Sequence, residues 1–367
     1  MPLPFRGPWL LFGALLSSWP PPSLAACPVP CECSEAARTV KCVGKDLSRI
    51  PSGLPGYTRN LFITGNHIPN LGTADLRGLP HLVTLGLSAN RINMVEYQAF
   101  ASLPNLRFLD LSNNLLAYVH PDAFNPVNNS IQELGLSRAL YNSSAIQHVA
   151  TSLSRGGFRH LSKLELADNA IVYLPPGMFV GMSNLRQLDL RNNSLVDIKN
   201  GTFADLRLDS IDLSLNALKT LRTGALGDLG VQASLHLYLK ENPFVCNCDI
   251  EELAAWLNVS TQVQDTEQLV CAFPEDLRNV SLVALAETEL DCHAVEDVLH
   301  PSYVFLGVVL GIVGMVFLFV LYLNRKGMKT WIISMRDGCH DLMEGYHYRY
   351  EIDSDPRVTR VSTTSDI

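Results

Sequence analysis

The chain has 367 residues, of which 47% are hydrophobic and 17% are charged. This apolar content is too high for a disordered chain, and the length suffices for more than one domain. With 28 Lys and Arg against 36 Asp and Glu, the net charge of -8 argues against nucleic acid as a partner. The longest apolar stretches stand at the start of the chain and in one block near its end, which indicates a membrane protein.

The first 26 residues have the pattern of a secretory signal peptide. Arg6 precedes an apolar stretch, and small residues follow at Ser23, Ala25 and Ala26. The alternative, a buried helix, conflicts with the three consecutive prolines at 20–22. We therefore predict a signal peptide at 1–26 and a mature chain that begins near Cys27.

Eight cysteines before the second apolar block fall into two clusters, and Cys339 follows the block. In an exported chain an even number predicts disulfides, because zinc would require suitably spaced histidines. Neighbours such as Cys31 and Cys33 cannot easily pair with each other, so two connectivities stay open in each cluster. We predict cysteine caps at 27–56 and 242–294. Their members are Cys27, Cys31, Cys33, Cys42, Cys246, Cys248, Cys271 and Cys292.

Residues 57–241 repeat the pattern LxxLxLxxNxL, mostly at intervals of 24 residues. This period is typical of leucine-rich repeats, in which each LxL segment is a strand and the stacked strands form one parallel sheet. An asparagine at each turn can bond backbone groups that the turn leaves unpaired. The predicted asparagine ladder consists of Asn66, Asn90, Asn114, Asn169, Asn193, Asn216 and Asn242.

A second column of aromatic residues is predicted to fill the convex core. It consists of Phe100, Phe124, Phe179 and Phe203.

The repeat rhythm breaks after Leu136, where Ala139 replaces the ladder asparagine and the next copy starts only at Leu161. We predict an irregular protruding loop at about 137–159, either a tolerated insertion or a binding loop.

The outward positions of successive strands predict the concave surface, because side chains alternate across a strand. Its flanks carry Arg59, Arg107, Lys163 and Arg186, so most of the face is predicted to be a solvated, salt-bridged surface. At the N-terminal end we predict a partner-binding spot in which Lys41 lies near Arg59 and Phe62, a cation beside an exposed aromatic ring. The central column is Phe62, Gly86, Asp110, Gly135, Glu165, Asp189, Asp212 and Tyr238.

Six Asn-x-Ser/Thr sequons precede the second apolar block, and an exported chain is expected to use those that are exposed. The predicted glycosylation sites are Asn128, Asn142, Asn192, Asn200, Asn258 and Asn279.

After a juxtamembrane segment at 295–303, residues 304–323 contain no charge and are long enough to cross a bilayer as a helix. Arg325 and Lys326 follow this segment, so the positive-inside rule places the N-terminal part outside. Gly307 and Gly311 form a GxxxG pair, which mediates homodimers in some spanning helices but not in many others.

The tail at 324–367 is too short to form a core and is predicted to act through partners. Its end, Ser365, Asp366 and Ile367, has the hydroxyl and apolar C-terminal residue of peptides that add a strand to a PDZ domain, a pattern that also arises by chance. The run EGYHYRYEI supplies tyrosines for phosphorylation or for a membrane-proximal ordered segment. Cys339 is a lipidation candidate.

No GxSxG elbow, HExxH helix or Walker loop occurs, so we predict neither an enzyme nor a bound cofactor or metal. The predicted fold class is an α/β solenoid: a leucine-rich-repeat horseshoe with disulfide-bonded N- and C-terminal caps, plus a single transmembrane helix.

Five segments resemble the trophoblast glycoprotein (Wnt-activated inhibitory factor) family: CECSEAARTVKCV, NPFVCNCD, YVFLG, LYLNRKG and EGYHYRYEI. The resemblance implies the disulfides Cys27–Cys33, Cys31–Cys42, Cys246–Cys271 and Cys248–Cys292. It also implies a plasma-membrane antagonist of Wnt/β-catenin signalling that acts on the Wnt co-receptor's availability. The resemblance also points to the N-terminal cap as the functional part, and it implies a role there for Lys41, in the string TVKC. The short N-terminal lead and the irregular 137–159 segment depart from the family.

Two functions remain open. The first is a signalling inhibitor whose ectodomain binds a Wnt pathway co-receptor or ligand. The second is an adhesion or motility protein whose tail engages PDZ scaffolds.

Overall fold

The computed structural model describes residues 27–124, 127, 129–285, 290, 292, 300–336 and 339. The chain divides into two compact units, residues 1–291 and 292–367. Each unit is considered by itself.

The first unit is a leucine-rich repeat solenoid built on a ten-stranded sheet. All its strand pairs are parallel except β1 and β2, which are antiparallel. Alternate side chains of these strands, mostly leucines such as Leu85 and Leu109, point into the core, which leaves their neighbours on the outer, concave face. The strands in order are β1 (Glu32–Ser34), β2 (Thr39–Val43), β3 (Asn60–Thr64), β5 (Thr84–Gly86), β7 (Phe108–Asp110), β9 (Glu133–Gly135), β10 (Lys163–Glu165), β11 (Gln187–Asp189), β12 (Ser210–Asp212) and β13 (His236–Tyr238).

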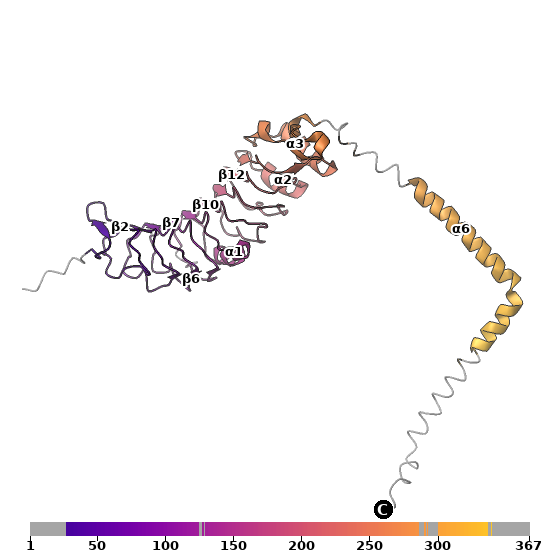
Figure 1. Cartoon of the computed structure of the whole chain (residues 1–367), viewed down its shortest axis with the longest axis horizontal. Helices are drawn as coiled ribbons and strands as arrows, with labels where there is room; N and C mark the ends of the chain where they lie inside the picture. Colours follow the sequence, from indigo (N-terminus) through magenta and orange to yellow (C-terminus); the bar gives the residue numbers. More distant parts are fainter. Residues whose placement is uncertain are drawn as a thin grey trace, which may run out of the picture. The chain divides into compact units, whose positions relative to one another are not determined.

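The opposite, convex side carries shorter elements. Strands β4 (Asn70–Leu71), β6 (Met94–Val95) and β8 (Tyr118–Val119) form a small parallel sheet. The labels β2, β7, β10 and β12 follow one edge of the unit, while β6 and α1 lie on the other (Figure 1). The predicted phenylalanine column is buried here: Phe100 stacks on Phe124 at a centroid distance of 4.9 Å, and Phe179 lies 6.1 Å from Phe203.

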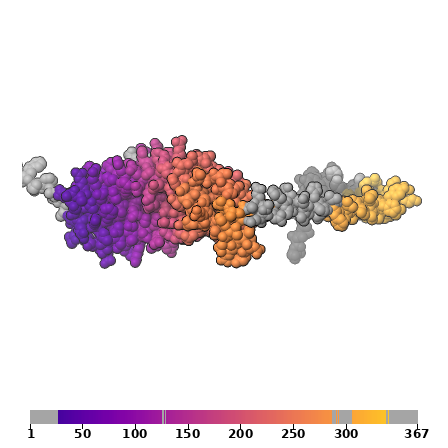
Figure 2. All heavy atoms as spheres, turned by 90° about the horizontal axis from the view of Figure 1, so that it is seen from above, coloured from indigo at the N-terminus to yellow at the C-terminus, as the bar shows by residue number. Residues whose placement is uncertain are grey.

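Coils of the solenoid follow one another in sequence order, as the continuous bands of colour from indigo to orange show (Figure 2). One hydrophobic cluster runs through them from Val40 to Leu285. Each coil therefore buries its leucines against its sequence neighbours, which is how a repeat too small to fold alone obtains a core.

The asparagine ladder is buried between the coils. Asn114 is representative: its Oδ1 accepts from the backbone N–H groups of Asn90 at 3.1 Å and Ile92 at 2.9 Å. Its Nδ2 donates to the carbonyl oxygens of Leu111 at 2.7 Å and Leu87 at 3.0 Å. One side chain thus satisfies backbone groups of two successive coils, which a leucine cannot do. The predicted ladder is confirmed at all seven asparagines, and so is the predicted gap at Ala139.

The prediction of a protruding loop at 137–159 is wrong. Residues of this segment form a short 3-10 helix, η1 (Ser143–Ala145), and the helix α1 (Ile146–Arg155), in which Ile146, Val149, Ala150 and Leu153 are buried. Their i, i+3, i+4, i+7 spacing gives one apolar helix face, and this face covers the convex core. The segment is therefore an enlarged repeat whose outer strand is replaced by a helix.

Both ends of the solenoid are closed by disulfides. The N-terminal hairpin β1–β2 carries Cys27–Cys33 and Cys31–Cys42. At the other end Cys246–Cys271 joins β14 (Phe244–Val245) to β15 (Cys271–Phe273), and Cys248 and Cys292 are also disulfide-bonded. Cys27–Cys33, Cys31–Cys42 and Cys246–Cys271 are pairs that the family resemblance implies. The remaining elements here are α2 (Thr223–Gly230), α3 (Glu251–Val259), η2 (Cys248–Ile250), η3 (Thr266–Gln268), η4 (Glu275–Leu277) and η5 (Leu282–Ala284).

In the second unit, α6 (His300–Leu323) contains the 19 consecutive residues Phe305–Leu323, which are long and apolar enough to cross a membrane. The large hydrophobic side chains of this range are exposed, apart from the half-buried Leu321, as expected of a segment whose solvent is lipid. Cys339 is a free, exposed thiol.

Candidate functional site

The concave face of the sheet holds the candidate site, and its central column follows from the strand register. Each member pairs directly with the next across neighbouring strands, so the column runs without a break from β2 to β13. Its members are Lys41, Phe62, Gly86, Asp110, Gly135, Glu165, Asp189, Asp212 and Tyr238. This is the column predicted by side-chain alternation, with Lys41 added at its N-terminal end.

At that end Lys41 is exposed and lies in register with Phe62, which is half-buried. The Phe62 ring lies over Gly86: a Cβ placed on Gly86 would approach the ring to 2.8 Å, so only glycine leaves room for it. Lys41 and Phe62 share an open hollow of about 520 Å³ with Glu32. A cation, an aromatic ring and a carboxylate thus line one solvent-exposed hollow.

Arg59 does not belong to this spot, so the predicted trio is corrected. Arg59 precedes β3 by one residue, and its backbone N–H donates to the carbonyl oxygen of Arg38. Its neighbour along the sheet is therefore Arg38 and not Lys41. Its side chain lines a separate hollow with Arg38 and Arg107. Arg59 lies before the start of β3, where strand alternation no longer fixes the direction of a side chain.

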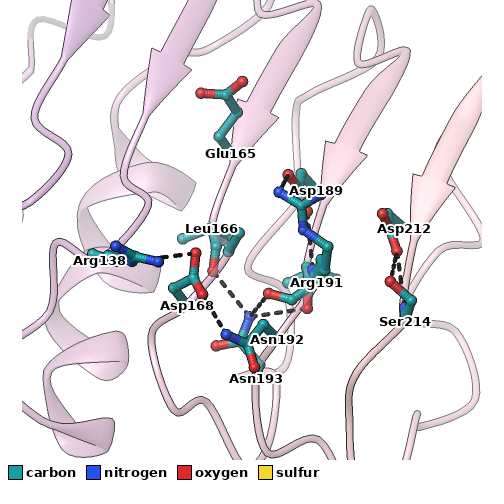
Figure 3. Close-up of polar contacts among 12 residues, drawn as sticks. Arg138, Glu165, Leu166, Asp168, Asp189, Arg191, Asn192, Asn193, Asp212 and Ser214 are labelled. Carbon is teal, nitrogen blue, oxygen red and sulfur yellow. Dashed lines mark hydrogen bonds and ion pairs between the residues drawn. The ribbon is translucent and has the colours of Figure 1, made fainter. Parts of the chain in front are cut away.

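The C-terminal half of the column is acidic, with Glu165, Asp189 and Asp212 on neighbouring strands (Figure 3). Lys163 Nζ lies 2.6 Å from Glu165 Oε1, and Arg191 Nη2 lies 3.8 Å from Asp189 Oδ2. Asp212 Oδ1 accepts from the Ser214 N–H at 2.9 Å. These contacts orient the carboxylates, but they leave the column with an excess of negative charge.

The prediction that the flanking cations form salt bridges across this face is therefore only partly right. Lys163 forms an ion pair. Arg186 instead donates to the carbonyl oxygens of Leu185 at 3.2 Å and Arg207 at 2.7 Å. Among the described residues, no ion pair within 4.0 Å involves Arg59, Arg107 or Arg186.

Two groups on this face have shifted pKa values. Burial raises the pKa of the Asp189 carboxyl, and Asp212 and Glu165 add to the rise, while the Arg191 N–H and guanidinium oppose it. The hydrogen bond to Glu165 is the main cause that raises the pKa of Lys163. Partial burial is thus the main cause that disfavours the ionised form of Asp189, and the neighbouring carboxylates add to it.

Replacing Asp189 by asparagine is expected to stabilise the ectodomain by about 0.5 kcal/mol near neutral pH, because it removes a charge that partial burial disfavours. The gain is small because the residue is partly exposed and the repulsion from Asp212 and Glu165 is screened. A carboxyl whose folded pKa is raised makes the native state bind more protons than the unfolded state, so its ionisation lowers stability as pH rises. The gain should disappear below about pH 4, where the carboxyl is protonated. Chemical unfolding at both pH values checks this. An equal gain at both would contradict it.

Sequence reasoning missed a hollow of about 170 Å³ in the middle of the face, walled by Phe62 and Phe108 and edged by Asp110, Glu133 and Glu165. It exists because the column has glycine at Gly86 and Gly135 between larger neighbours. That alternation of glycine with bulky residues was visible in the sequence and is the signal that could have found it.

All the predicted sequons that lie in the described residues are exposed: Asn142, Asn192, Asn200, Asn258 and Asn279. Asn142 also caps η1 and accepts from the Ala145 N–H at 3.2 Å, and Asn192 donates to Asp168. Asn128 lies outside the described residues. So do the predicted signal peptide at 1–26, most of the juxtamembrane segment, and the PDZ-type end at Ser365, Asp366 and Ile367.

Gly307 and Gly311 lie in α6, and a Cβ on either would meet no atom within 4 Å. Within the described residues, no group of three or more His, Cys, Asp and Glu side chains is arranged to hold a metal ion.

A disulfide-capped leucine-rich repeat ectodomain and an apolar helix of membrane-spanning length together define a single-pass cell-surface glycoprotein with its repeats outside the cell. Family models agree: the leucine rich repeat N-terminal domain matches residues 26–55, and the leucine rich repeat matches 57–116, 80–138 and 159–218. The chain belongs to the trophoblast glycoprotein family.

Full-length relatives support this membership. Trophoblast glycoprotein of Macaca fascicularis is 45% identical over 97% of this chain and 89% of its own length. The Homo sapiens protein of the same name is 43% identical over 95% of this chain and 87% of its own length. Homo sapiens trophoblast glycoprotein-like is 36% identical over 95% and 91%.

A crystal structure of the human protein, also named Wnt-activated inhibitory factor 1, matches this chain with a TM-score of 0.67 at 40% identity. The match covers 73% of this chain and 100% of the crystallised one. The capped solenoid is therefore a fold that both chains share.

Proposed function

We propose that this chain inhibits Wnt/β-catenin signalling from the plasma membrane and that its ectodomain carries the activity. The observation that carries the proposal is the match to human Wnt-activated inhibitory factor 1, since this chain covers the whole of the crystallised relative. The relatives are leucine-rich repeat glycoproteins, which supports action by binding rather than by catalysis. A Wnt pathway co-receptor or ligand is the proposed partner.

The surface around Lys41 and Phe62 is the proposed contact. Lys41 is exposed at the N-terminal end of an otherwise acidic column, and Phe62 offers a half-buried ring beside it. A desolvated aromatic ring with a neighbouring cation is the composition of a binding hot spot. Arg59, which lines another hollow, is not part of this contact.

Reversing the charge at Lys41 is expected to abolish inhibition in a β-catenin reporter assay of Wnt-treated cells. Lys41 pairs across the hairpin with Glu32, so Lys41→Glu also sets two carboxylates opposite each other, at a cost of roughly 0.2–1 kcal/mol. Lys41→Gln removes the charge without that repulsion and should weaken inhibition in the same direction.

The matched control is Lys219→Glu, which makes the same change at an exposed lysine near the other end of the solenoid. With equal surface levels it should inhibit like the unchanged chain. Equal inhibition by all variants would remove Lys41 from the contact. No inhibition by the unchanged chain would reject the Wnt proposal itself.

The alternative proposal is an adhesion or motility protein that couples to PDZ scaffolds through Ser365, Asp366 and Ile367. A form that ends at Lys329 separates the two proposals. Reporter inhibition that survives this truncation supports the ectodomain as the active part, whereas loss of cell adhesion or motility effects on truncation supports the tail. Glycosylation at the exposed sequons is proposed under either function.

A further inference from the structure

A basic hollow of about 650 Å³ lies where the first strands of the sheet begin, beside the column of the concave face. Its polar lining consists of Arg38, Arg59, His81, Arg107, Asn60 and Asn105, and no carboxylate lines it. In a chain of net charge -8, three arginines around one hollow are a local reversal of the overall charge.

The arginines form a row because the backbone places them at equivalent positions of successive coils. The Arg59 N–H donates to the Arg38 carbonyl at 2.8 Å, the Val83 N–H to the Arg59 carbonyl at 2.8 Å, and the Arg107 N–H to the Val83 carbonyl at 2.9 Å. With roughly 4.8 Å between neighbouring strands, the row from Arg38 to Arg107 spans roughly 14 Å. The row is rigid, because the sheet fixes its spacing.

Within the part of the chain that the structure describes, the three arginines of this row have no acidic partner within 4.0 Å, whereas four other arginines of the ectodomain do. Arg138, Arg155, Arg191 and Arg278 each form an ion pair. Among the described residues, no ion pair includes a residue of the basic row, although all three of its arginines are exposed. Like charges on adjacent strands destabilise a sheet, so the arrangement gains when an anionic ligand neutralises it.

We propose that the row Arg38–Arg59–Arg107 binds a sulfated glycosaminoglycan. Guanidinium groups bind oxyanions through two parallel N–H donors, and a linear polymer with repeated sulfates matches three arginines spread along one line, with Val83 between the second and the third. The hollow is broad, open and mainly polar, and lacks the large apolar anchor pocket that a protein partner requires. Such polymers are found outside cells, on the side of the membrane that carries this ectodomain.

This site is distinct from the proposed Wnt contact, although the two hollows adjoin at Ala37. Lys41 and Phe62 line a different hollow, and the basic row lies at the beginning of the strands rather than on the central column. Loss of one function therefore need not affect the other.

The test measures binding of the purified full-length chain in detergent to a size-defined heparin oligosaccharide at physiological salt. The row variant is Arg38→Gln, Arg59→Gln and Arg107→Gln together, which removes three charges without reversing them. The matched control removes three charges at the exposed, scattered arginines Arg77, Arg207 and Arg222. Thermal unfolding of all three proteins checks that each is folded.

The row variant is expected to bind heparin at least about tenfold more weakly, whereas the control should stay within about twofold, and binding should weaken as salt rises. Equal weakening by both variants would show that overall charge alone attracts the polymer, and this would overturn the proposal. So would an absence of heparin binding by the unchanged chain. A polyglutamate peptide that binds as tightly as heparin would point to an acidic protein partner instead. The Lys41→Gln variant is expected to keep its heparin affinity within about twofold.

Discussion

Replacing Asn169 by leucine is expected to destabilise the ectodomain by roughly 3–5 kcal/mol, because buried backbone groups lose their partners at about 1–3 kcal/mol each. Asn169 Oδ1 accepts from the N–H groups of Ala139 at 2.9 Å and Leu140 at 3.0 Å. Its Nδ2 donates to the carbonyl oxygens of Leu136 and Ala167. Leucine fills a similar space but can make none of these bonds.

Asn169 is expected to contribute more stability than the other ladder asparagines, because the preceding coil has Ala139 at the ladder position. Elsewhere each coil is bonded by its own asparagine and by the next one, as Asn90 and Asn114 show. The coil that carries α1 depends on Asn169 alone for its turn, so a single substitution should loosen the solenoid at this point.

Chemical unfolding of a secreted form that ends before α6 measures this cost. The control is Asn184→Leu, the same change at an exposed asparagine that makes one bond, to the Arg159 carbonyl. It should cost less than about 1 kcal/mol. If Asn169→Leu cost no more than the control, the ladder would not be what holds these coils together.

The ladder and the sheet were predictable from the sequence because both depend on local periodicity. A leucine every second residue fixes which side chains enter the core, and an asparagine at constant spacing fixes the turn. The central column from Phe62 to Tyr238 followed from the same alternation and agrees with the observed register.

The side-chain partners were not predictable in this way. Whether Arg186 reaches a carboxylate or a carbonyl depends on the rotamers of long, flexible side chains and on neighbours contributed by other coils. Arg59 was misplaced because alternation holds only within a strand. Consequently the sequence identified Lys41 and Phe62 as neighbours but did not reveal the basic row.

Helix α1 was missed although its signal is present. Ile146, Val149, Ala150 and Leu153 have helical spacing, but the serines and the paired glycines around them obscure a pattern only ten residues long. What decides the conformation is the convex core beneath it. The apolar face gains burial there that an isolated short helix would not obtain in water.

Leu153→Ala is therefore expected to destabilise the ectodomain by about 2–5 kcal/mol, the cost of removing a buried leucine and leaving a cavity. Leu153 is 1% exposed and lines the small internal gap next to Phe124. Alanine is the better helix former, so any loss measures packing and not helix propensity.

Gln147→Ala is the control, since Gln147 is exposed on the same helix, and it should leave stability unchanged within about 0.5 kcal/mol. Chemical unfolding of the secreted form measures both. Equal, small effects would mean that α1 lies loosely on the surface, as the loop prediction held. A large loss confined to Leu153→Ala would establish that this enlarged repeat is part of the continuous core, which transmits the position of one coil to the next along the solenoid.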